Sequence, residues 1–167
     1  MTAQRQDGYV WRPGIAAITL LAGFCAACNS VAAAAETTQR IVVDRFTGLA
    51  VDGFDPVAYF VERRPVLGLP EFEAWKEGVV WRFHNEGNRA SFLAHPEIYG
   101  PQFGGYDPVD IARGITVAGN PLFWLIVRER LYLFGFEANR AAFAADPKNF
   151  LDKAQARWPT LKQGLAQ

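Results

Sequence analysis

The pattern of apolar and polar positions between residues 51 and 150 predicts one short series of elements twice. Apolar and aromatic residues concentrate in two pairs of short runs, and three mainly polar residues join the members of each pair, which is typical of β-hairpins. The four predicted strands are residues 72–75, 79–84, 122–127 and 131–134. A helix is expected after each hairpin, the first with Asn85 as its N-cap, and each should end where Pro96 or Pro147 blocks its continuation.

An Asp-Pro-Val segment stands before each predicted hairpin. Asp55 and Asp107 are suited to cap a helix, because Asp accepts hydrogen bonds from free backbone N–H groups and the following Pro has no N–H to leave unpaired. Only a turn or two of helix can follow before Pro65 and Gly114. The predicted unit is therefore a short helix, a β-hairpin and a second helix.

The two series also match residue by residue. Residues 53–57, Gly-Phe-Asp-Pro-Val, return at 105–109 as Gly-Tyr-Asp-Pro-Val, an offset of 52. The Asn-Arg-Ala segment that begins at Asn88 returns at Asn139, an offset of 51. A period near fifty residues indicates one supersecondary unit used twice.

The predicted fold class is therefore α+β, a tandem duplication of a short helix–β-hairpin–helix unit that forms one small compact domain. The four strands could form one sheet or two hairpins packed face to face, and we favour one sheet, because helices from both units could then cover a single apolar face. The expected parts are a lead-in at 36–50, a duplicated domain at 51–159 with repeats at about 51–99 and 103–150, and a C-terminal tail at 160–167.

Residues 1–35 predict a secretory signal peptide. Basic residues precede an apolar run at 15–28 that is too short to span a bilayer comfortably, and small residues follow it. We expect cleavage after Ala35, which places the protein in the periplasm or outside the cell. Lipidation at Cys28 is the alternative, and it would hold the protein at a membrane surface.

Removal of the signal peptide changes the chemistry that the chain can perform. The only two cysteines, Cys25 and Cys28, and the only methionine, Met1, would leave with it. A disulfide, a cysteine nucleophile and soft sulfur ligands are then excluded. Two basic residues and one acidic residue leave as well, so 17 and 17 become 15 basic and 16 acidic residues. This near-neutral balance argues against a nucleic-acid partner, which would need a basic surface.

Several motifs in order resemble the YHS domain family, and in particular secreted bacterial YHS-domain proteins. They are the Asp-Pro-Val segments, Trp81-Arg82-Phe83-His84-Asn85, residues 88–92, 96–99 and 101–106, and Arg157-Trp158-Pro159. The resemblance covers about residues 51–159 and implies a small module suspected of binding metal, copper among the candidates. Relatives place cysteines where this chain has Ala58, Asp107 and Asp110, so any thiolate site of the family is absent here.

His84, Asp55 and Asp107 are the candidate metal ligands that remain. His95 should lie roughly 15 Å from His84 along the intervening helix, too far to share one ion. The competing interpretation is that His84 is a strand-end side chain bonded to a neighbour and that the two aspartates are helix caps. If they approached each other instead, they could serve as general acid and base or hold a hard cation.

The sequence thus predicts a secreted or periplasmic binding module that is not an enzyme. It would act through a groove between the repeats or through a protein partner, and its partner would be an unknown small ligand or a periplasmic protein. No cofactor is expected, and any metal should bind weakly. The alternative is a metal-handling accessory protein that uses His84 with carboxylates. An enzyme with a carboxylate site comes third, because no nucleophile elbow, phosphate loop or metal-binding motif is present in the sequence.

Overall fold

The computed structural model describes Thr2 and residues 40–165. Apart from Thr2, the predicted signal peptide, with Cys28 and the expected cleavage position after Ala35, lies outside the described residues. Within the described part, no helix is long and apolar enough to cross a bilayer.

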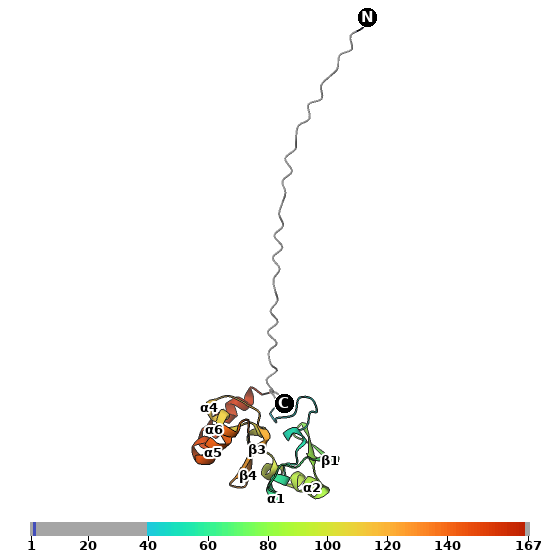
Figure 1. Cartoon of the computed structure of the whole chain (residues 1–167), viewed down its shortest axis with the longest axis vertical. Helices are drawn as coiled ribbons and strands as arrows, with labels where there is room; N and C mark the ends of the chain where they lie inside the picture. Colours follow the sequence, from blue (N-terminus) through green and yellow to red (C-terminus); the bar gives the residue numbers. More distant parts are fainter. Residues whose placement is uncertain (1, 3–39, 166–167) are drawn as a thin grey trace. The chain divides into compact units, whose positions relative to one another are not determined.

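Two corresponding series of elements follow one another along the chain (Figure 1). The first half, residues 51–99, contains η1 (Val51–Gly53), α1 (Ala58–Val61), β1 (Leu69–Lys76), β2 (Val79–Phe83), α2 (Glu86–Ala94) and α3 (Pro96–Tyr99). The second half, residues 103–150, and its flanks contain η2 (Gln102–Gly105), α4 (Pro108–Arg113), β3 (Asn120–Val127), β4 (Arg130–Phe134), α5 (Glu137–Ala145) and α6 (Pro147–Gln163). The mixed α+β class is confirmed, with two small antiparallel sheets.

The helix ends follow the capping residues of the sequence. The Asn85 side chain accepts a 2.8 Å hydrogen bond from the Asn88 N–H at the start of α2, as predicted. Asp107 caps α4 and Asp146 caps α6 in the same way. Pro stands in the first turn of α3, α4 and α6, where its missing N–H leaves no hydrogen bond unmade.

Both hairpins have the same register and the same irregularity. Leu69 pairs with Phe83 in the first, Asn120 pairs with Phe134 in the second, and each ladder then shifts before it resumes four residues later. Such a bulge bends the strand and increases its twist. The turns are two residues long, Glu77-Gly78 and Arg128-Glu129, and all four residues have positive φ, as in a type I′ turn.

The expectation of a single four-stranded sheet is wrong, because β1 pairs only with β2 and β3 only with β4. The free edge of β2 is used by the lead-in: the Ala50 N–H donates to the Val80 carbonyl at 2.9 Å, and Leu49 bridges Val80 in parallel. A strand edge that is already paired in this way cannot accept a strand of the other hairpin. The halves are joined by side chains instead.

The central core cluster contains residues of both halves. Leu131 and Leu133 of β4 belong to the same buried cluster as Tyr59, Trp81 and Phe83 of the first half. The Tyr59 hydroxyl, buried in the interior, donates to the carbonyl of Pro121 at 3.0 Å. Figure 1 shows β3 and β4 between α2 and β1 on one side and α4, α5 and α6 on the other. The described residues therefore share one interior.

Helix α6 is a feature that the sequence analysis did not predict. It runs for 17 residues and passes through Pro159, so the expected tail at 160–167 begins inside it. Its inner side packs on α4: Ala154 is fully buried in one cluster with Ile111, and Trp158 and Leu161 pack against that cluster. The helix forms one wall of the site described below.

Candidate functional site

Asp55 is a completely buried carboxylate that links three parts of the first half. Its Oδ1 accepts hydrogen bonds from the N–H groups of Val57 at 2.8 Å and Ala58 at 3.3 Å, at the start of α1. Its Oδ2 accepts from the His84 N–H at 2.8 Å, at the end of β2, and from Asn88 Nδ2 at 2.6 Å, on α2. One side chain thus holds the short helix, the hairpin and the long helix together.

Asp107 makes the corresponding contacts in the second half and is also completely buried. Its Oδ1 accepts from the Val109 N–H at 2.8 Å, and its Oδ2 accepts from the Gly135 N–H and from Asn139 Nδ2, both at 2.8 Å. The capping role that the Asp-Pro pattern favours is therefore present for Asp107, which is the N-cap of α4. The N-cap residue of α1 is Val57, so Asp55 accepts from N–H groups at the start of α1 without being its N-cap.

A second carboxylate, Asp110, lies beside Asp107. Asn139 Nδ2 donates to Asp110 as well, at 2.9 Å, and Arg113 donates to Asp110 at 2.7 Å. The first half has no equivalent, because Ala58 stands at the matching position. Burial raises the pKa of Asp107, the negative charge of Asp110 acts in the same direction, and the hydrogen bonds from Asn139, Gly135 and Val109 oppose the rise.

The three predicted metal ligands are not gathered into one site. Within residues 40–165, no three His, Cys, Asp or Glu side chains come close enough together to hold a metal ion. Asp55 and Asp107 direct their oxygens at N–H groups of their own halves, and His84 meets Asp55 through its backbone while its side chain is exposed. His95 lies on the surface 3.5 Å from Glu97.

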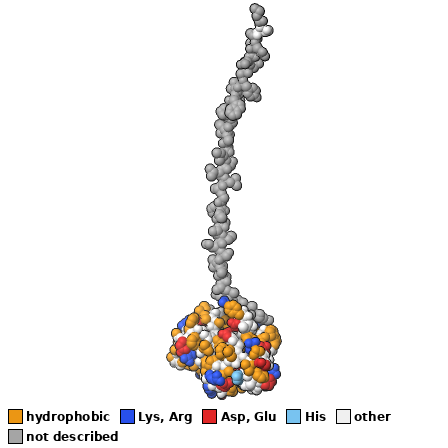
Figure 2. Space-filling view, turned by 45° about the vertical axis from the view of Figure 1, so that its right-hand side comes forward, with side chains coloured by type: hydrophobic (Ala, Val, Ile, Leu, Met, Phe, Trp, Pro, Cys, Tyr) orange, Lys and Arg blue, Asp and Glu red, His pale blue; other side chains and the backbone are white. Residues whose placement is uncertain are grey.

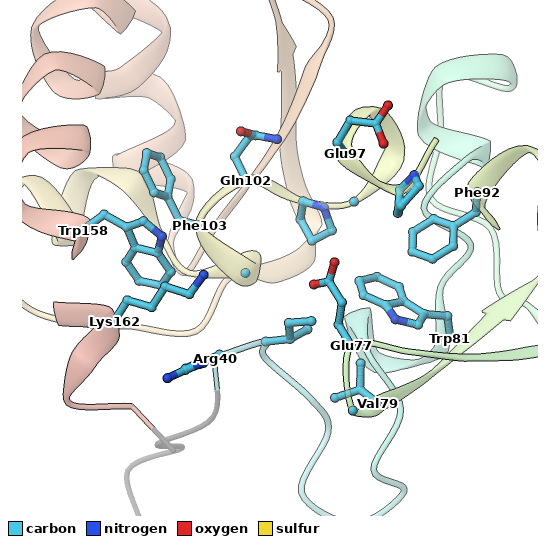
Figure 3. Close-up of a pocket in the computed structure, with 16 residues that line it drawn as sticks. Arg40, Glu77, Val79, Trp81, Phe92, Glu97, Gln102, Phe103, Trp158 and Lys162 are labelled. Carbon is cyan, nitrogen blue, oxygen red and sulfur yellow. The ribbon is translucent and has the colours of Figure 1, made fainter. Parts of the chain in front are cut away.

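A cavity of about 680 Å³ lies in the described part of the chain. The first half supplies one side of it, from the β1–β2 turn, β2, α2 and α3. Helix α6, η2 and Arg40 of the lead-in supply the other side (Figure 3). The volume lies within the range of about 300–1,000 Å³ that is usual for small-ligand sites.

Aromatic pairs stand on the two sides of this groove. Trp81 and Phe92 pack with their ring centroids 4.7 Å apart and are almost wholly buried. Phe103 and Trp158 meet edge to face at 5.7 Å and are partly exposed. The Trp81 indole N–H donates to the Lys76 carbonyl at 3.1 Å, which holds the ring in position.

Four charged side chains border the groove, and they are separated by sign. Glu77 and Glu97 lie on the side of Trp81 and Phe92, whereas Arg40 and Lys162 lie on the side of Phe103 and Trp158 (Figure 3). On the face drawn in Figure 2, acidic and basic side chains are interspersed. The groove therefore has an acidic side and a basic side.

Gly104 explains how Arg40 is held at the groove. Its φ is +65°, and a Cβ at this position would collide with the carbonyl oxygen of Arg40. The Gly104 carbonyl accepts a 2.8 Å hydrogen bond from the Val42 N–H, so the lead-in lies directly against η2. Only glycine permits this approach, and it places Arg40 beside Phe103.

Sequence reasoning did not assign the residues of this groove. Phe103 and Trp158 were singled out only as part of the resemblance, and Glu77 only as a turn residue. A readable signal was present for Trp158: with Leu151, Ala154 and Leu161 it forms an apolar series at helical spacing. No spacing rule would have indicated the exposed charges.

Comparisons with protein-family models, with curated proteins and with solved structures give no match for this chain.

Proposed function

We propose that this protein is a duplicated α+β binding module, related to YHS domains, that holds a small ligand in the groove between its first half and helix α6. The tandem duplication is part of the proposal. It is supported by two hydrogen-bond arrangements, around Asp55 and around Asp107, that involve matching positions at offsets of 52 and 51.

The observation that carries the proposal is the groove itself. A cavity of about 680 Å³ has aromatic residues on both sides and charged residues at its border. Partly exposed aromatic rings beside a few polar groups are typical of sites that bind small organic molecules. Binding without turnover is the proposed activity, because the buried carboxylates serve as structural acceptors in both halves.

The place of action also belongs to the proposal. The predicted signal peptide and the near-neutral charge of the remaining chain suit a protein that is exported and that binds a small molecule in the periplasm or outside the cell.

The proposal is tested with uncharged aromatic probes, indole and phenol, by saturation-transfer NMR on the exported chain. We expect both probes to bind, and we expect Trp158→Ala to abolish the signal. Trp75→Ala is the matched control, because Trp75 is 70% exposed on β1 and does not border the groove. Gln102→Trp, which fills the groove, provides a second test if Trp158→Ala does not fold. Probe binding that survives in both groove variants, or that never occurs, would refute the proposal.

A further inference from the structure

The charges around the groove are not used by neighbouring side chains. Among the residues that the structure describes, no ion pair involves Arg40, Glu77 or Lys162. Glu97 meets only His95, at 3.5 Å, and both of these side chains are more than half exposed. Some surface charges elsewhere are paired, as in Arg140–Glu137 and Lys148–Asp152, whereas others, such as Glu129 and Lys153, are in no ion pair within the described residues. The groove therefore retains charge of both signs that is available to a ligand.

The backbone positions of the charged residues keep the acidic and basic charges on opposite sides of the groove. Glu77 occupies the turn between β1 and β2, and Glu97 lies in the first turn of α3. Lys162 lies one turn after Trp158 on α6, so both can face the groove. All of these positions belong to hydrogen-bonded elements or tight turns, which restrict how far each charge can move.

This arrangement selects against ligands that carry a single sign of charge. A cation would be attracted to Glu77 and Glu97 but repelled by Arg40 and Lys162 across the groove. An anion would be attracted to the basic side and repelled by the acidic side. A ligand with a positive group at one end and a negative group at the other satisfies both sides. Exposed charges contribute little affinity individually, so their role is to orient the ligand and to discriminate.

We propose that the groove binds a zwitterionic ligand with an apolar body. Its ammonium group lies by Glu77 and Glu97, its anionic group lies by Arg40 and Lys162, and its apolar body contacts Phe103 and Trp158. A short peptide with free termini has this chemistry. This inference rests on the proposed function of the groove and adds the class of ligand.

The test uses the tripeptide alanyl-phenylalanyl-alanine in four forms: free, N-acetylated, C-amidated and capped at both ends. Titration calorimetry on the exported chain should show that each cap weakens binding by up to about fivefold, the upper end for one exposed ion pair. In Lys162→Glu, C-amidation should no longer weaken binding. In Glu77→Lys, N-acetylation should no longer do so.

Two control variants carry the same charge changes outside the groove. Glu129→Lys alters the turn of the second hairpin, and Lys153→Glu alters an exposed position on α6. Both should bind the four peptides as the unaltered protein does. Equal effects of control and groove variants would overturn the inference.

The outcomes distinguish this inference from the proposed function. If the doubly capped peptide binds as well as the free one and Trp158→Ala still abolishes binding, the groove is a ligand site but the ligand is not a zwitterion. If neither the peptides nor indole and phenol bind, both the inference and the proposed function fail.

Discussion

The carboxylate sites of the two halves have the same framework but different surroundings. Asp55 and Asp107 each accept hydrogen bonds from a helix start, a strand end and an asparagine side chain. Only Asp107 has a second carboxylate beside it, Asp110, which is held by Arg113. The hydrogen bonds around the central aspartate serve the fold in both halves. The presence of Asp110 and Arg113 shows that the second half also tolerates a buried acidic pair.

The two hairpin turns differ in a comparable way. Glu77-Gly78 borders the groove, while Arg128-Glu129 does not. The groove is thus made by the first half together with α6, a helix that extends beyond the matched elements. The first half supplies its hairpin turn to the groove, whereas the second half supplies Phe103 and Gly104 of η2 but not its hairpin turn.

Removal of either central carboxylate should have the largest effect. We expect Asp55→Ala and Asp107→Ala each to lower the free energy of unfolding by about 3 kcal/mol, because several buried donors lose their acceptor at once. Urea denaturation measures this. Asp152→Ala, at an exposed position of α6, should change stability by less than about 0.5 kcal/mol. The proposed equivalence of the halves would be wrong if only one of the two aspartates were important.

Substitution of the asparagine that binds each central aspartate should cost a different amount of stability in the two halves. Asn139 donates to both Asp107 and Asp110, whereas Asn88 donates through its side chain to Asp55 alone. We expect Asn139→Ala to cost about 2–3 kcal/mol and Asn88→Ala about 1–2 kcal/mol in unfolding free energy.

An Asp110→Ala background provides the control for this comparison. The cost of Asn139→Ala should then approach that of Asn88→Ala, because the second carboxylate is gone. An unchanged cost in that background would show that Asp110 is not responsible for the difference.

The pH dependence of the unfolding free energy should reveal the raised pKa of Asp107, which lies beside Asp110. Burial raises the pKa of Asp107 above its ordinary value of 3.8, so between that value and the raised one the folded state holds more protons than the unfolded state. The contribution of this group is therefore fully present below pH 3.8 and is lost as the pH rises through the raised pKa.

Asp107→Asn provides a reference that does not titrate at this position. The unfolding free energy of the unaltered protein, minus that of Asp107→Asn, should fall as the pH rises above 3.8. We expect this change to be smaller than the loss caused by Asp107→Ala. A difference that stays constant or increases with pH would contradict the raised pKa.

Local patterns predicted most of the elements of the fold. Asn85, Asp107 and Pro96 marked helix ends correctly, since capping and proline effects depend on residues close in sequence. The single sheet was wrong, because each hairpin forms its own sheet and a distant contact, Ala50 with Val80, occupies the outer edge of β2. Strand neighbours of this kind are decided by tertiary packing, which local patterns do not record.

The candidate site was much less predictable than the fold. Asp107 was correctly expected to cap a helix, whereas the N-cap of α1 is Val57 and not Asp55. The links of the two aspartates to Asn88 and Asn139 depend on how hairpin and helix pack. Helix α6 was missed because no helix was predicted after Pro147, although the helix runs from Pro147 to Gln163. The groove charges come from a turn, the lead-in, α3 and α6, so their proximity arises only after folding.

A substitution in the second hairpin turn should have the smallest effect on stability, and it should stabilise the protein where the preceding variants destabilise it. Glu129 has a φ of +57° and Gly78, its counterpart, a φ of +82°. Glycine adopts positive φ without strain, whereas a residue with a side chain does so at a cost. We therefore expect Glu129→Gly to raise the free energy of unfolding by about 0.5 kcal/mol, the strain relief being partly offset by the greater freedom of glycine in the unfolded chain. Gly78→Ala should lower stability by about 1 kcal/mol for the converse reason. Thermal and urea denaturation of both variants test this pair, and a stabilising Gly78→Ala would show that the two turns do not share the type I′ conformation.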